Sequence, residues 1–172
     1  MALANDLLLQ ATQLASIDTG KPKQANLRRA VSAAYYALFH LLIDDGAASA
    51  GSKVSAAAKA RIRRAFAHAD MKTVCSQYAK ASAAGSMNAQ IAPLLTWPLA
   101  SDLKNVAETF VTLQEARHQA DYDLSTKFSR IDVVGYIDIT EIAFADWTTA
   151  KTTANAKIFL MDLLLRKTWS RT

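Results

Sequence analysis

Cysteine, proline and glycine are scarce in this chain. Its 172 residues include one Cys, three Pro and five Gly. The single thiol, Cys75, cannot form an intramolecular disulfide or a thiolate metal site, which excludes disulfide-rich scaffolds and cysteine-based zinc or iron–sulfur centres. Turn-forming residues are too few for a many-stranded β-sandwich or β-barrel. With 34 alanines, the composition instead favours helices.

Long hydrophobic runs are also missing. The longest apolar stretch, residues 33–43, contains His40 and is well short of the roughly 20 residues that a membrane-spanning helix needs. The N-terminus has no basic segment and reaches Asp6 before any long apolar run, so it does not resemble a signal peptide. We therefore expect no transmembrane helix, no membrane partner and a location in the cytoplasm.

Acidic residues are rare in the middle of the chain. The net charge is +5, yet residues 46–100 carry seven basic residues against Asp70 alone, so this segment holds the whole excess. A basic surface of this kind attracts phosphate backbones or acidic partners. The solvated face of an ordinary helix has the same composition, and both interpretations stay open.

Apolar residues recur at three- and four-residue steps, and Gly, Pro or short polar runs separate these periodic segments. The pattern predicts an all-α fold, an antiparallel bundle of about five helices forming a single domain over residues 1–172. The predicted helices cover residues 3–17, residues 24–45 with an end at Gly46, most of residues 56–84, residues 101–121, and a last segment from Ser129 or Asp132 through Leu164. Threonines crowd residues 148–153, so the last helix is predicted to be long or kinked.

The predicted helix over residues 24–45 has two contrasting faces. One face is apolar, and the other carries Arg29, Ser32, Tyr36 and His40. A phenol and an imidazole one turn apart are unusual on an exposed face, so this face is expected to be half-buried or part of a site. Either Tyr36 and His40 pack and hydrogen-bond within the bundle, or they bind a substrate together with Arg29.

A second group of polar residues ends the predicted helix over residues 101–121. Arg117 and Asp121 are four residues apart, as are His118 and Tyr122, so two side-chain pairs occupy neighbouring faces of one turn. The simplest interpretation is a surface ion pair beside an aromatic contact, worth on the order of a few tenths of a kcal/mol.

Taken together, these two segments resemble the higher eukaryotes and prokaryotes nucleotide-binding (HEPN) family. The resemblance lies in Leu27-Arg-Arg-Ala-Val-Ser-Ala-Ala-Tyr-Tyr-Ala-Leu-Phe-His40 and in Ala116-Arg-His-Gln-Ala-Asp-Tyr122. It implies an all-α bundle that is commonly a homodimer. Many members of the family are metal-independent endoribonucleases that are paired with an antitoxin or a nucleotidyltransferase, so the resemblance implies this activity and these partners as well.

The resemblance also implies roles for individual residues. In active members an Arg, a polar neighbour and a later His line a cleft at the dimer interface. Arg117 matches the Arg and His118 the polar neighbour. The position of the family His either holds Tyr122 or lies elsewhere within residues 121–124, where this sequence has no His. The candidate catalytic residues are therefore Arg117, His118 and Tyr122. Metal-free RNA cleavage needs a base, an acid and a cation, and the base would have to be His118 or His40, because a phenol is a poor base at neutral pH.

Two main functional hypotheses follow, and whether the protein is an enzyme stays open. In the first, the protein binds or cuts RNA, with Lys59, Arg61, Arg63 and Arg64 adding phosphate contacts. In the second, it is a non-catalytic interaction protein that forms a homodimer or binds a nucleotidyltransferase or antitoxin. A weaker third hypothesis is a nucleotide site between Arg29, Tyr36 and Arg117.

The candidate substrate-binding residues are Arg29, Tyr36, His40 and Asp121. A homodimer is expected to bring the helices over residues 24–45 and 101–121 near its axis, because the ring-bearing face would otherwise be exposed to water. No metal-ligand spacing and no phosphate-binding glycine loop occurs in the sequence. We therefore expect no metal and no cofactor.

Overall fold

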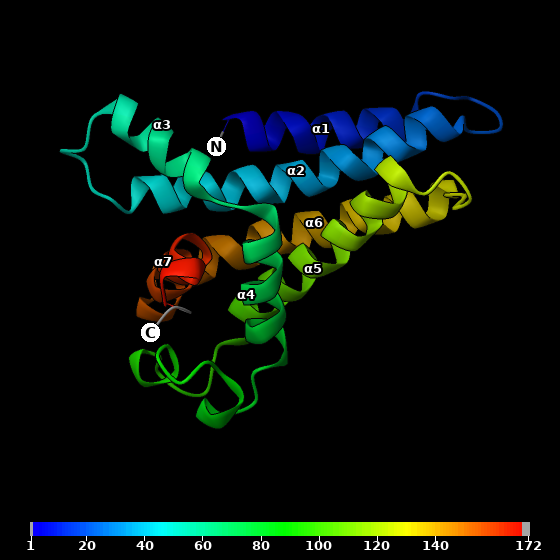
Figure 1. The fold of residues 1–172 in the computed structure, drawn as a ribbon. Coiled ribbons are helices and arrows are strands. Elements are labelled where there is room, and N and C mark those ends of the chain that lie inside the picture. Colours follow the sequence, from blue (N-terminus) through cyan, green and yellow to red (C-terminus); the bar gives the residue numbers. More distant parts are fainter. Residues whose placement is uncertain (1, 170–172) are drawn as a thin grey trace. The chain divides into compact units, whose positions relative to one another are not determined.

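The computed structural model describes residues 2–169, and all regular structure within them is helical (Figure 1). The seven α-helices of this range are α1 (Ala2–Ser16), α2 (Gln24–Ala48), α3 (Ala56–Ala65), α4 (His68–Lys80), α5 (Ser101–Tyr122), α6 (Arg130–Ala150) and α7 (Ala154–Trp169). Two short 3-10 turns, Ala84–Ser86 and Ala92–Leu94, lie between α4 and α5. The predicted all-α class is confirmed.

The predicted number of about five helices is too low, because two predicted helices are each divided. The segment over residues 56–84 forms α3 and α4, with an extended backbone at Phe66 and Ala67. The long last segment forms α6 and α7, which are separated by residues 151–153. This second break lies within the threonine-rich stretch where a kink was expected, and Thr153 accepts a hydrogen bond from the amide of Ala156 at the start of α7.

Gly46 does not end α2, contrary to the prediction. The helix continues to Ala48, and the glycine makes room for the ring of Phe66. A Cβ at position 46 would lie 2.5 Å from Cζ of Phe66, far closer than carbon atoms pack. Phe66 is buried, so the extended backbone between α3 and α4 places an apolar ring against Gly46 of α2.

The chain divides into two compact units. Unit 1 comprises residues 1–41 and 109–145, and unit 2 comprises residues 42–108 and 146–172. Helices α2, α5 and α6 therefore each contribute one part to unit 1 and the other part to unit 2.

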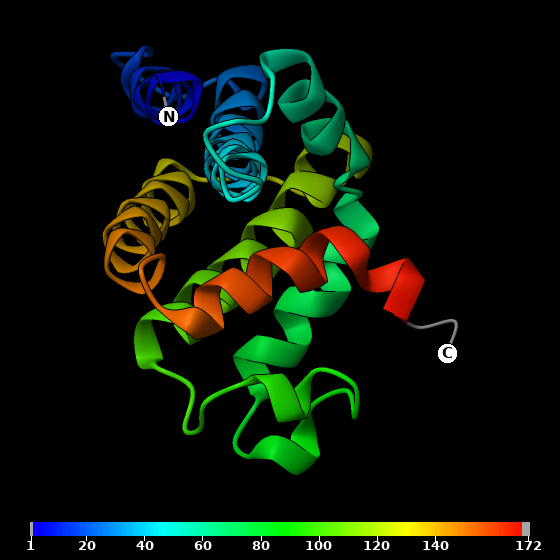
Figure 2. The same ribbon diagram turned by 90° about the vertical axis from the view of Figure 1, so that its left-hand side faces the viewer.

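In unit 1, α1 and the first part of α2 run antiparallel, side by side (Figures 1 and 2). The predicted apolar face of α2 is buried, since Leu27, Val31 and Leu38 have no exposed surface. Polar contacts join the loops at one end of the unit. The side-chain amide of Gln24 donates to the carbonyl oxygen of Phe128 and accepts a hydrogen bond from the backbone N–H of the same residue. Arg130 donates to the carbonyl oxygen of Asp18.

In unit 2, α4 packs against α7. The rings of Tyr78 and Phe159 meet edge to face, with centroids 4.8 Å apart. The indole Nε1 of Trp147 donates to Oδ2 of Asp45 at 2.7 Å, and Nζ of Lys151 lies 3.7 Å from the same oxygen. The buried indole of Trp147 thus has a hydrogen-bond partner.

Candidate functional site

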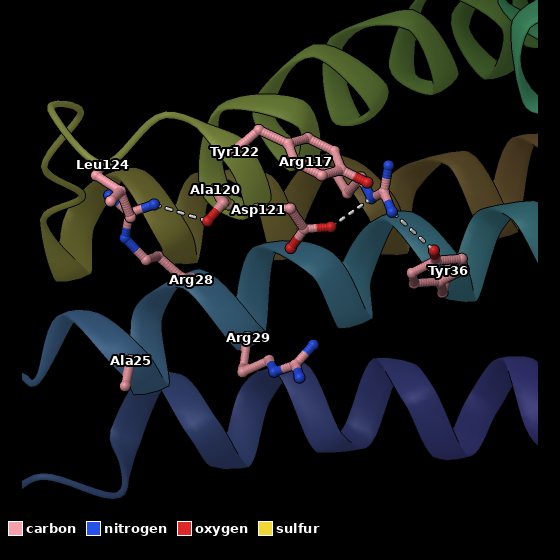
Figure 3. Close-up of a pocket in the computed structure, with 9 residues that line it drawn as sticks. All are labelled: Ala25, Arg28, Arg29, Tyr36, Arg117, Ala120, Asp121, Tyr122 and Leu124. Atoms are coloured by element: carbon pink, nitrogen blue, oxygen red, sulfur yellow. Dashed lines mark hydrogen bonds and ion pairs between the residues drawn. The ribbon is translucent and has the colours of Figure 1, made fainter.

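Arg117 is the centre of a polar group in unit 1. It lies near the end of α5, one helical turn before Asp121, so the two side chains leave the helix on the same face. Nε of Arg117 lies 2.6 Å from Oδ2 of Asp121, and Nη2 donates to the hydroxyl of Tyr36 on α2 at 3.0 Å (Figure 3). The side chains of Arg117 and Asp121 are each 22% exposed, so this ion pair is not the solvated surface pair of the simplest interpretation.

Three tyrosine rings surround the guanidinium of Arg117. Its Cζ atom lies 5.4 Å from the ring centroid of Tyr122, 5.6 Å from that of Tyr36 and 6.0 Å from that of Tyr35. These distances are in the range of cation–π attraction, which strengthens when the cation is partly desolvated. The rings therefore stabilise the cation at this position.

The charge of Arg117 is permanent. Burial alone disfavours the charged form, but the neighbouring Tyr36, Asp121 and Tyr122 outweigh that effect and raise the pKa of Arg117 above its usual value. Any anion that enters the site therefore meets a full positive charge at every pH at which the protein is folded.

Asp121 is held by two helices. Its Oδ2 lies against Arg117, and its Oδ1 accepts a hydrogen bond of 2.7 Å from the buried hydroxyl of Ser32 on α2. Both carboxylate oxygens are thus occupied. Asp121 therefore orients Arg117, and its role in substrate binding stays a prediction.

Arg28 holds the end of α5 and the loop after it. Its guanidinium donates to the carbonyl oxygens of Ala120 at 2.7 Å, Asp123 at 2.9 Å and Thr126 at 2.7 Å. The last carbonyls of a helix have no partner within the helix, and an arginine is well suited to bind them. Sequence reasoning missed this role, because nothing in the sequence distinguishes Arg28 from its neighbour Arg29.

Arg29 is exposed and has no hydrogen bond or ion pair with any described residue. The free guanidinium lines two adjacent pockets. Since an arginine presents five donors in a rigid plane, Arg29 is available to bind an anion without giving up an existing contact.

These side chains line an open pocket of about 540 Å³, which we call the arginine pocket. Its polar and aromatic lining consists of Arg28, Arg29, Arg117, Asp121, Tyr36 and Tyr122 (Figure 3). Three guanidinium groups face one carboxylate, so the pocket carries an excess of positive charge. Tyr122 is 65% exposed, and its ring offers a stacking surface at the entrance.

The two candidate histidines do not line this pocket. His118 is exposed, and its ring centroid lies 5.1 Å from that of Tyr122. His40 lies one turn beyond Tyr36 on α2, with ring centroids 6.4 Å apart. None of the described residues that line the arginine pocket is a histidine. The structure therefore groups Arg117, Tyr122, Tyr36, Arg29 and Asp121, and leaves out His118 and His40.

The basic residues of α3 belong to unit 2. Among them, Arg63 is already paired, since its Nε lies 2.5 Å from Oδ1 of Asp44. Within residues 2–169, no group of three or more His, Cys, Asp or Glu side chains is arranged to hold a metal ion. No helix in the same range is both long and apolar enough to cross a membrane.

Comparison with known proteins adds no relative. No family model matches the chain, and neither a curated protein nor a solved structure shows significant similarity to it. The resemblance to the HEPN family therefore stays a prediction that rests on the two segments quoted above.

Proposed function

We propose that unit 1 binds RNA, with the arginine pocket holding a phosphate group and one base. One observation supports this most directly: Arg29, whose guanidinium has no partner among the described residues, lines the same pocket as the permanently charged Arg117. Two tyrosine rings line that pocket as well. Arginines bind phosphate oxygens in a planar, bidentate manner. Aromatic rings that stack on unpaired bases are a common means of binding single-stranded RNA.

The lining of the arginine pocket supports RNA binding but not RNA cleavage. Metal-free cleavage requires a group that removes the proton of the 2′-hydroxyl. Of the pocket's described lining residues, none is an imidazole, and Asp121 is engaged by Arg117 and Ser32. Arg117 supplies a cation for a phosphate, whereas no lining group offers itself as a base.

A fluorescence-anisotropy titration with a labelled single-stranded RNA of about eight nucleotides tests the binding. The dissociation constant is measured at 50 and 200 mM salt for the wild type, for Arg29→Ala and for Lys157→Ala. Lys157 is an exposed residue of α7, so its variant loses the same charge outside unit 1. We expect several-fold weaker wild-type binding at the higher salt, a loss of about tenfold in Arg29→Ala, and no change in Lys157→Ala.

Two results would overturn the proposal. A folded wild-type protein that binds no RNA at 50 mM salt contradicts RNA binding itself. The absence of cleavage is tested separately: the RNA is incubated with the protein in the presence of a metal chelator and then examined by gel electrophoresis. If the wild type cuts the RNA and Arg117→Ala does not, the protein is a ribonuclease rather than a binding module.

An interaction protein is the second candidate, and one feature of α6 favours it. Ile131, Val134 and Ile142 share one helical face and are 85%, 42% and 57% exposed. Asp138 shares this face, and exposed apolar side chains of this kind suit a second copy of the chain, a nucleotidyltransferase or an antitoxin. The rings on α2 that motivated a dimer axis there are half-buried within unit 1. Sedimentation of the wild type and of Ile142→Lys tests this candidate, because a dimer through α6 would dissociate in the variant.

A further inference from the structure

A second pocket, of about 380 Å³, adjoins the arginine pocket in unit 1. It lies between α1 and α2, and we call it the α1–α2 pocket. Leu7, Gln10 and Leu14 line it from α1, and Arg29, Ser32 and Tyr36 line it from α2. Arg29 and Tyr36 are thus common to both pockets.

The lining of the α1–α2 pocket suits a nucleobase. Leu7 and Leu14 are half-buried and provide apolar walls, while the exposed amide of Gln10 offers both a donor and an acceptor. None of its described lining residues is acidic. Its volume lies within the range of small-molecule sites, roughly 300–1,000 Å³.

The position of Arg29 relates the two pockets to one another. Arg29 lines both pockets, and its guanidinium has no hydrogen-bond or ion-pair partner among the described residues. A phosphate bound there would be adjacent to both pockets at once. In a nucleic acid, the phosphodiester is the group that lies between two neighbouring nucleosides.

We infer that the α1–α2 pocket holds the base next to the one in the arginine pocket, and that Arg29 binds the phosphodiester that links them. This inference rests on the proposed RNA binding and narrows its ligand. The preferred ligand has at least two linked nucleotides, and a free mononucleotide occupies only part of the site.

Calorimetric titration with a 5′-phosphorylated diribonucleotide and with the corresponding mononucleotide tests the inference. We expect the wild type to bind the dinucleotide at least tenfold more tightly. The variant Leu14→Trp fills the α1–α2 pocket, so it should lose this advantage while its affinity for the mononucleotide stays unchanged. Leu9→Trp is the matched control, because Leu9 is also on α1, is 58% exposed and lines neither pocket.

A second variant keeps the test valid if Leu14→Trp does not fold. Gln10 is exposed, so Gln10→Ala should leave the fold intact and reduce the dinucleotide advantage several-fold. A wild type without preference for the dinucleotide overturns the inference, as does a preference that persists in both folded variants. If RNA binding still depends on Arg29 in either case, only the inference about the α1–α2 pocket is wrong. If the wild type binds no RNA at all, both that inference and the proposed function are wrong.

Discussion

The carboxylate of Asp121 lies 2.6 Å from Nε of Arg117, the cation at the centre of the arginine pocket. The same pair that orients the guanidinium also neutralises part of its charge. A phosphate entering the pocket therefore competes with Asp121 for Arg117. If the pocket binds RNA as proposed, its affinity depends on this competition as well as on the number of arginines.

Replacing Asp121 with Asn should strengthen RNA binding. The amide keeps the size of the side chain but removes the competing charge, so we expect the dissociation constant to fall about three- to tenfold in the anisotropy assay. Asp138→Asn is the matched control, since Asp138 is exposed on α6 in the same unit and does not line the pocket. Equal gains in the two variants would mean that only net charge matters.

Neighbouring arginines on α2 should differ sharply in their effect on stability. Arg28→Ala removes the charged donor that holds the carbonyls of Ala120, Asp123 and Thr126, and we expect the free energy of unfolding to fall by about 2–3 kcal/mol. Arg29→Ala removes no hydrogen bond or ion pair with a described residue and should change the free energy of unfolding by no more than about 0.5 kcal/mol. Urea unfolding monitored by circular dichroism measures both. Similar values for the two variants would contradict the role of Arg28.

Two glycines on helices should respond in opposite directions to alanine. At Gly46 a Cβ would meet the ring of Phe66 at 2.5 Å, so Gly46→Ala should lower the free energy of unfolding by about 1–3 kcal/mol. At Gly135 on α6 an added Cβ would meet no atom of the described residues within 4 Å, apart from its chain neighbours and the backbone of its own helix. Gly135→Ala should therefore raise the free energy of unfolding by about 0.5–1 kcal/mol. The double variant Gly46→Ala/Phe66→Leu should recover part of the loss, and a lack of recovery would show that the ring is not the cause.

Stability should depend on pH through Asp162 of α7. Its carboxylate is fully buried, and both oxygens are without a hydrogen-bond partner among the described residues. Burial raises its pKa to about 6 although Arg166 acts in the opposite direction, and on α4 the groups coupled to it are the thiol of Cys75 and the hydroxyl of Tyr78.

The folded state therefore holds a proton on Asp162 that the unfolded state releases near pH 4. This contribution to stability is present below pH 4, falls as the pH rises from about 4 to about 6, and is lost above that range. The difference in unfolding free energy between the wild type and Asp162→Asn should change across the same window by about 1–3 kcal/mol. Glu108→Gln, at an exposed position, serves as the control. A difference that is flat from pH 4 to 7 would contradict the raised pKa.

The sequence predicted the helical class and the buried face of α2 because both depend on local spacing. Leu27, Val31 and Leu38 recur at helical steps, and burial follows from that recurrence. The break at Phe66 has no such local signal, since neither Gly nor Pro stands there. At this break the buried ring of Phe66 meets Gly46, which lies 20 positions earlier in the chain, and no local pattern predicts that contact.

The candidate site was predictable in part for the same reason. The pairing of Arg117 with Asp121 follows from a spacing of four on a helix, and the structure confirms it. The contact of Arg117 with Tyr36 spans 81 positions, so no local spacing predicts it, and the sequence grouped the two residues only in the hypothesis of a nucleotide site. His118 could not be separated from Arg117 by spacing alone, because the direction of each side chain depends on how α5 packs against α2 in unit 1.

The division of the chain bears on the order in which the protein can fold during synthesis. Residues 42–108 of unit 2 interrupt unit 1, so the arginine pocket cannot form until the ribosome has completed α5 and the loop after it. Until then the ring of Tyr35 on α2 lacks its contact with Phe110 on α5, and apolar surface that is exposed during synthesis is prone to aggregation. Because both units are discontinuous, a single truncation within residues 42–145 removes part of each, and neither unit can be produced alone by shortening the gene.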